Sequence, residues 1–217
     1  MRHRTRFLRD NPCLALLAVQ LGGVVLYPFM DDSGTGRAAY SIFGLLVLAL
    51  AVRALRATPA TTWVGVLLAV PAAGILLTTI VTGRAGLFAW SSGFEAALYL
   101  YAGTSMLFYM LDDEEVTTDE LFAVPAVFTL FAWAFAYLFV VLQALDPGSF
   151  APSGGDRSWM ELLFLSFTTL SSTGLSDITP LSAHARSVVM LEQLAGLFYI
   201  AMVVTRLVAL RGSRRAR

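Results

Sequence analysis

Residues 171–177, with the sequence SSTGLSD, carry closely spaced hydroxyl groups and little bulk except at Leu175. Gly174, in the middle of this run, can adopt a positive φ that other residues resist. The preceding residues, 159–170, are mostly apolar and predict a short helix. The C-terminal end of a helix carries about half a negative charge, which attracts cations and repels anions. The pattern therefore favours a site for cations.

The short helix has a clear start and a limited reach. Ser158 and Glu161 have the spacing of a capping box, which predicts a helix beginning at residue 159. Residues 159–170 would cover roughly 18 Å, about half of a bilayer, so they are too short to span it. Long apolar segments flank them on both sides. Because irregular backbone at membrane depth is tolerated only inside protein or beside a watery cavity, we expect a re-entrant helix and loop.

The overall composition is that of a membrane protein. Hydrophobic residues make up 57% of the chain and charged residues only 14%. The formal net charge is zero, which argues against a nucleic-acid partner because no large basic face is available. The single cysteine excludes an intrachain disulfide.

Apolar runs of spanning length predict an all-α membrane protein with six transmembrane helices. The expected spans are residues 13–30, 39–55, 62–81, 86–111, 118–145 and 183–210. The short helix and its loop then lie between spans five and six. We expect residues 1–116 to form a four-helix domain and residues 117–217 to form a second domain that holds the loop.

Arginines set the expected orientation. When the six spans alternate, the arginines of both terminal segments, together with Arg53 and Arg56, fall on one side. The positive-inside rule places that side in the cytoplasm, and with it both termini. The loop between spans five and six then enters from the outer face.

Residues 167–180, FTTLSSTGLSDITP, resemble the pore signature of the potassium-channel superfamily. The filter of that family usually reads TVGYG, followed by an aspartate and a nearby proline. The residues that match the filter by position are Ser172, Thr173, Gly174, Leu175 and Ser176. Asp177 matches the aspartate at the outer mouth. The resemblance is strongest over residues 159–211.

The resemblance implies a bacterial inner (plasma) membrane protein that forms a homotetramer in the lipid bilayer. In that family the filter carbonyls and the innermost hydroxyl replace the hydration shell of a monovalent cation, K⁺ or Na⁺. It implies no enzymatic activity and no cofactor beyond the permeant ion.

Two departures from the family pattern leave alternatives open. Leu175 stands where the family has tyrosine, and Ser176 stands where it has the second glycine. If the family backbone persists, Ser176 must adopt a left-handed conformation at a cost of roughly 1–2 kcal/mol. The alternatives are a non-selective Na⁺/K⁺ channel, or a non-conducting regulatory or structural subunit. An intramembrane serine protease using Ser176 and His184 is disfavoured, because His184 lies at the start of the next span.

Span six carries the other candidate residues of the pore. Glu192 can support the filter or make an ordinary interhelical hydrogen bond, and Gly196 matches a hinge or a close-packing site. Four apolar residues at helical spacing can form an inner constriction or simply pack: Ile200, Val203, Val204 and Leu207.

Two groups of carboxylates lie outside the pore segment. The linker after span four holds Asp112, Asp113, Glu114 and Glu115. It can be a solvated linker, can meet the arginine tail and bias a gate, or can sense divalent ions or protons. Glu95 lies within span four, where it can reach water or a tyrosine. Span four lacks regularly spaced arginines, which predicts little voltage dependence and leaves the gating stimulus open.

Overall fold

The computed structural model describes residues 12–29, 34–55, 62–82, 87–112, 118–151 and 155–215. Apart from a 3₁₀ turn and two short strands, the regular elements of these residues are α-helices, which confirms the all-helical prediction. In chain order the elements are α2 (Pro12–Leu26), η1 (Tyr27–Phe29), α3 (Gly34–Leu55), α4 (Thr62–Thr82), α5 (Phe88–Asp112), α6 (Thr118–Leu145), β1 (Phe150–Ala151), α7 (Trp159–Leu170), β2 (Thr179–Pro180) and α8 (Ala183–Arg215).

Within the described residues, three helices are long and apolar enough to cross a membrane. The qualifying stretches are Thr62–Thr79 in α4, Leu121–Leu145 in α6 and Ala183–Arg206 in α8. The expected first span, 13–30, is shorter than predicted, because α2 ends at Leu26. Pro28 explains this end, since the residue before a proline is biased away from the helical conformation. The count of six spans remains a prediction.

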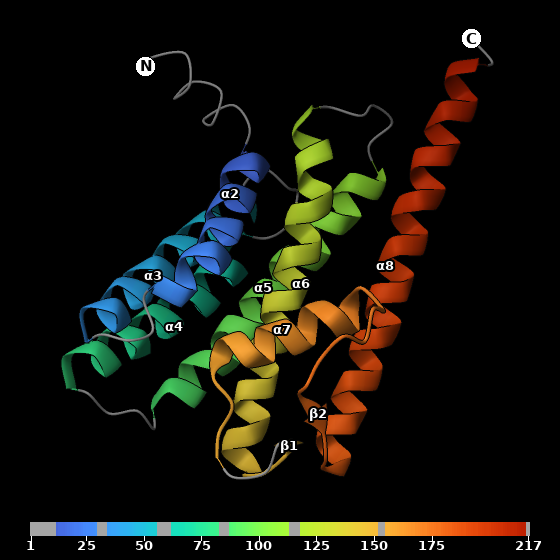
Figure 1. The fold of residues 1–217 in the computed structure, drawn as a ribbon. Helices are drawn as coiled ribbons and strands as arrows, with labels where there is room; N and C mark the ends of the chain where they lie inside the picture. Colours follow the sequence, from blue (N-terminus) through green and yellow to red (C-terminus); the bar gives the residue numbers. More distant parts are fainter. Residues whose placement is uncertain are drawn as a thin grey trace.

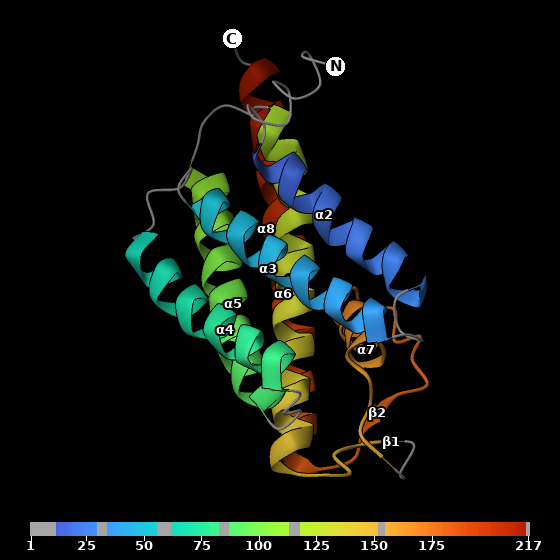
Figure 2. The same cartoon turned by 90° about the vertical axis from the view of Figure 1, so that its left-hand side faces the viewer.

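The helices are arranged around a central pair, α5 and α6, which pack along each other. Helices α2, α3 and α4 lie on one side of this pair and α8 lies on the other (Figure 1). Figure 2 shows α2 and α3 inclined to the long axis of α6. The hydrophobic core runs from α2 and α5 through α6 to α7. It therefore crosses the expected boundary between residues 116 and 117, and the division into two domains remains a prediction.

Helix α6 is the most buried of the three candidate spans. It packs against α2, α5, α7 and α8, and residues 132–137 are all buried although they point in every direction around the helix. A helix that is apolar all round is expected at the centre of a fold. Helix α6 therefore forms the buried surface against which α7 packs.

The chain between α6 and α8 leaves one end of the helix bundle and returns to it. Strand β1 pairs antiparallel with β2, Phe150 opposite Pro180 and Ala151 opposite Thr179. The Leu181 N–H also donates to the Ser149 carbonyl at 2.7 Å. Between the strands, α7 lies about midway along α6 and α8, and the following loop descends to the start of α8 (Figure 1).

Candidate functional site

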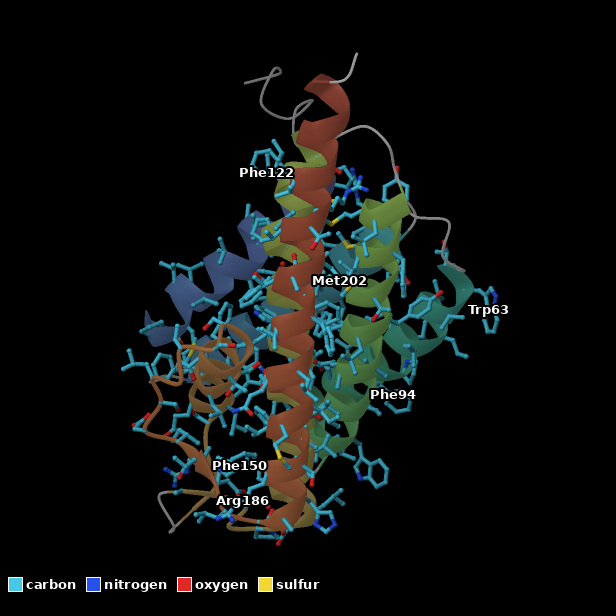
Figure 3. All side chains as sticks on the ribbon, turned by 90° about the vertical axis from the view of Figure 1, so that its right-hand side faces the viewer. Trp63, Phe94, Phe122, Phe150, Arg186 and Met202 are labelled. Atoms are coloured by element: carbon cyan, nitrogen blue, oxygen red, sulfur yellow. The ribbon has the colours of Figure 1, made fainter. Side chains whose placement is uncertain are left out.

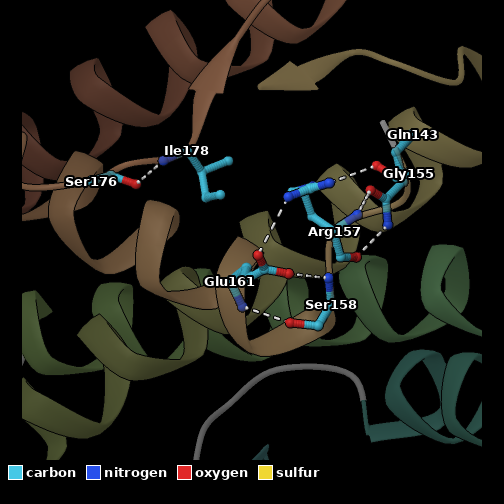
Figure 4. A network of polar contacts seen from close by, with 7 residues as sticks. All are labelled: Gln143, Gly155, Arg157, Ser158, Glu161, Ser176 and Ile178. Carbon is cyan, nitrogen blue, oxygen red and sulfur yellow. Dashed lines mark hydrogen bonds and ion pairs between the residues drawn. The ribbon is translucent and has the colours of Figure 1, made fainter. Parts of the chain in front are cut away.

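The N-terminal end of α7 is capped as the sequence predicts. The Glu161 N–H donates to Ser158 Oγ at 3.3 Å, and the Ser158 N–H donates to Glu161 Oε2 at 2.6 Å. Arg157 adds an ion pair to Glu161 at 3.6 Å (Figure 4). The predicted capping box is therefore confirmed.

A glutamine at the end of α6 fixes the residue that precedes this cap. Gln143 Nε2 donates to the Arg157 carbonyl at 2.8 Å, and the Arg157 N–H donates to Gln143 Oε1 at 2.9 Å (Figure 4). The first residue of α7, Trp159, packs its ring edge-on to Trp133 of α6, with 5.0 Å between centroids. Sequence reasoning missed Gln143, whose only signal is a lone amide near the end of an apolar helix. These contacts tie the start of α7 to α6.

The C-terminal end of α7 closes in a Schellman motif. The Ser172 N–H donates to the Thr169 carbonyl at 3.0 Å, and the Thr173 N–H donates to the Thr168 carbonyl at 2.9 Å. Ser172 lies between them in the left-handed region, with φ 60°. This is the position after a helix where glycine is most common.

The hydrogen bonds at this end leave carbonyl oxygens of the loop unused. The Thr168 carbonyl also accepts from the Gly174 N–H at 3.0 Å and from Thr173 Oγ1 at 3.2 Å. The N–H groups of residues 172–174 are thus all directed at the end of α7. Within the described residues, no hydrogen bond is accepted by the carbonyls of Ser172, Thr173 or Leu175. These oxygens are available to a ligand that accepts electron pairs, such as a cation.

The left-handed residue of the loop is Ser172, and the expectation of a left-handed Ser176 is wrong. Among the described residues, Ser172 is the non-glycine residue with a positive φ, and Gly174 follows with φ 66°. Ser176 instead accepts a hydrogen bond at its Oγ from the Ile178 N–H, at 3.1 Å (Figure 4). Ser172 is left-handed because it follows the end of α7, at the position where the Schellman motif requires a positive φ.

The outer part of the loop is uncovered in a single chain. Leu175 is 75% exposed, and Asp177 is exposed as well. In the described residues Ser176 makes no hydrogen bond to His184, because its hydroxyl is directed at Ile178. The Ser176–His184 pair that a serine protease would need is therefore not assembled in this structure.

Glu192 of α8 lies against α7. Its side chain is fully buried and makes a hydrogen bond with the Ser166 hydroxyl of α7. Ser166 Oγ also donates to the Ala132 carbonyl of α6, at 2.8 Å. The contact is an interhelical hydrogen bond, as one of the two alternatives expected, and a role in supporting the filter remains a prediction. The contacts of Ser166 were not predicted from the sequence, because a single small residue within an apolar helix gives no local signal.

Gly196 packs directly against the end of α7. A Cβ atom at this position would lie 2.0 Å from the Leu170 carbonyl oxygen, which no side chain can accommodate. Glycine at an interface lets two backbones approach closely. The contact gives Gly196 a packing role, whereas its role as a hinge remains a prediction.

The expected inner constriction divides between two faces of α8. Ile200 and Val204 are exposed, but Val203 is only 9% exposed and packs inside its own chain. The side chain of Leu207 lies outside the described residues. Figure 3 views the molecule from the side of α8, with Met202 labelled, and no other helix lies in front of it. The exposure of Ile200 and Val204 shows only that neither side chain packs inside its own chain.

One comparison with known proteins identifies the segment that holds this site. Residues 125–210 match the model of a family described as ion channel. The match begins in α6 and includes α7, the loop and α8 up to residue 210. With the apolar helices, it indicates an ion channel in a membrane. Comparisons with curated proteins and with solved structures found no match.

The acidic linker after α5 falls largely outside the described residues. Asp113, Glu114 and Glu115 are not described, and Asp112 is described only as the last backbone position of α5. Nearby, Arg206 Nη1 of α8 donates to the Leu111 carbonyl at 2.8 Å, which ties α8 to the end of α5. A contact between the linker and the arginine tail remains a prediction.

Glu95 is buried among aromatic residues. It is 2% exposed and hydrogen-bonds to Tyr137 of α6, in agreement with the tyrosine alternative. The ring of Tyr137 lies 5.6 Å from that of Trp159. Glu95 therefore connects α5 to the start of α7. Among the described residues, no group of three or more histidine, cysteine or acidic side chains is placed to hold a metal ion.

Proposed function

We propose that this protein is a tetrameric cation channel that conducts K⁺ through a filter formed by residues 172–176. The observation that carries the proposal is the end of α7, where the N–H groups of residues 172–174 are satisfied internally and neighbouring carbonyls are left free. A row of free carbonyls can replace the water around a cation as the ion passes. The C-terminal end of α7 adds its partial negative charge at the same place.

The free face of α8 supports assembly into a ring. Its buried side chains form one stripe at helical spacing: Ala185, Val189, Glu192, Gly196, Tyr199 and Val203. The remaining surface carries exposed apolar residues that include Leu194, Leu197 and Phe198. One chain supplies one wall of a filter, so closed symmetry with four copies completes the pore. In that ring part of the free face and Leu175 contact neighbouring copies.

The arrangement of the helix ends supports the expected orientation. The start of α2 and the end of α8 lie at one end of the molecule, and β1 and β2 lie at the opposite end (Figure 1). Arginines of both terminal segments then share the cytoplasmic side of a bacterial inner membrane. The filter loop faces outward, and Asp177 adds negative potential at its mouth.

Two alternatives follow from the same loop. Ser176 is not left-handed and Leu175 lacks the hydroxyl of tyrosine, so a wider loop would pass Na⁺ as well as K⁺. A loop that does not order in the ring would make the chain a non-conducting regulatory or structural subunit. Ion flux distinguishes these outcomes.

Gly174→Ala tests the filter, with Gly148→Ala as its matched control. Both glycines have a positive φ, 66° and 86°, and neither has an atom within 4 Å of an added Cβ. Backbone strain is therefore similar at the two sites, but only Gly174 lies among the free carbonyls. We expect Gly174→Ala to abolish K⁺ flux into vesicles that contain the purified protein, and Gly148→Ala to conduct. Equal flux through the two variants would contradict the filter assignment.

A further inference from the structure

A line of three oxygen atoms crosses the interior behind the filter. The Ser166 hydroxyl of α7 lies between the Ala132 carbonyl of α6 and the Glu192 carboxyl of α8. Ser166 and Glu192 are both fully buried. The line therefore joins α6, α7 and α8 through two buried side chains.

Counting hydrogen atoms along this line determines the state of the carboxyl. Each of the two contacts needs one hydrogen atom between its oxygens. A serine hydroxyl has one, and a backbone carbonyl has none. Ser166 donates its hydrogen to Ala132 at 2.8 Å, so the hydrogen between Ser166 and Glu192 must come from the carboxyl group.

The surroundings of Glu192 also disfavour a carboxylate. Its second oxygen, Oε2, is buried with no hydrogen-bond partner among the described residues. Ser166 is the hydrogen-bond partner of this carboxyl, and no ion pair of the described residues includes it. An unpaired buried carboxylate is far more costly than an unpaired carbonyl oxygen. In a neutral carboxyl Oε1 carries the proton and Oε2 is such a carbonyl oxygen.

We propose that Glu192 is a neutral positioning residue that holds the end of α7 by donating a hydrogen bond to Ser166. Two contacts, each four residues apart on both helices, define how α8 meets α7: Glu192 with Ser166, and Gly196 with Leu170. The Schellman motif that directs the loop N–H groups begins within this segment, at Thr168. The proton on Glu192 thereby fixes the base of the filter. This role rests on the proposed channel function, but the protonation itself does not.

Infrared difference spectroscopy tests the protonation without requiring conduction. At neutral pH the wild-type-minus-E192Q difference spectrum is expected to show the C=O stretch of a buried protonated carboxylic acid, because the variant has lost the carboxyl group of Glu192. The control is D156N. Asp156 is exposed, so this variant removes a carboxyl group that is in contact with water. If the difference spectrum shows that the wild-type protein has a carboxylate band, and no acid band, where E192Q has neither, the proposal is overturned.

Flux and selectivity test the positioning role. Glutamine can donate from Nε2 to Ser166, so E192Q is expected to keep K⁺ flux and the preference for K⁺ over Na⁺. E192A and S166A break the line and leave a buried partner unsatisfied, and we expect the permeability ratio of K⁺ over Na⁺ to fall about tenfold. Retention of the tetramer in each variant is checked by mass. If E192A matches E192Q, Glu192 does not position the filter; if no variant and no wild type conducts, the channel function fails while the infrared result stands.

Discussion

The two ends of α7 differ in how they use their backbone groups. At the N-terminal end, Ser158 and Glu161 satisfy each other, and Gln143 holds both backbone groups of Arg157. At the C-terminal end the N–H groups turn inward while the carbonyls of Ser172 and Thr173 have no partner in the described structure. The N-terminal end of α7 is fixed to α6, and the C-terminal end leaves carbonyl oxygens free to bind a ligand.

This difference explains how an irregular loop can be held at a fixed place. A loop of small residues has few contacts of its own, and its position must come from the elements that carry it. The start of α7 is fastened to α6 by Gln143 and the Trp133–Trp159 ring contact. The end of α7 is backed by Glu192 and Gly196 of α8. The loop can then leave its carbonyls free without losing its position.

The largest effect is expected at the C-terminal end, from Gly196→Ala. The added Cβ would lie 2.0 Å from the Leu170 carbonyl oxygen, so α7 and α8 must separate, at a cost of about 3 kcal/mol. We expect a lower unfolding temperature of the purified protein in detergent and loss of K⁺ selectivity. Gly74→Ala is the matched control, because its Cβ would meet nothing within 4 Å inside α4. Equal unfolding temperatures for the two variants would show that α7 and α8 do not pack as described.

A smaller effect is expected at the N-terminal end, from Gln143→Ala. The change removes two hydrogen bonds to the Arg157 backbone and leaves partly buried groups unsatisfied, at a cost of about 2 kcal/mol. Thermal unfolding measures the loss. The control, Leu145→Ala, removes a side chain that is 79% exposed on the same turn of α6. If the control loses as much stability, the amide does not anchor α7.

The smallest effects distinguish the two serines of the loop. Ser172→Gly relieves a left-handed residue and should raise the free energy of unfolding by about 1 kcal/mol. Ser176→Gly removes the hydrogen bond to the Ile178 N–H and should lower it by about 0.5–1 kcal/mol. Both are measured by denaturant unfolding in detergent. If Ser172→Gly lowers the free energy of unfolding and Ser176→Gly raises it, the backbone strain lies at Ser176, as the family pattern suggested.

Local spacing predicted much of this arrangement. Ser158 and Glu161 predicted the start of α7 because a capping box depends on residues only three positions apart. Apolar runs predicted α6 at 118–145, which are its bounds in the structure. Pro28 is also a local signal, which places the end of the first helix near Leu26, where α2 ends in the structure.

Contacts between distant residues were not predictable from the sequence. Gln143, Ser166 and Glu192 meet partners 14, 34 and 26 residues away in the chain, which no local pattern reveals. The left-handed position was assigned to Ser176 by analogy with a glycine, whereas the structure places it at Ser172 because α7 ends there. The helix end determines the geometry of the loop.

The most direct test of the filter is the reversal potential of the purified tetramer in a planar bilayer, with K⁺ on one side and Na⁺ on the other. The free carbonyls of Ser172, Thr173 and Leu175 predict a clear current that reverses near the K⁺ equilibrium potential. Clear current that reverses near zero would indicate the weakly selective alternative. A stable tetramer that passes no current under any stimulus applied would contradict the assignment of residues 172–176 as a filter.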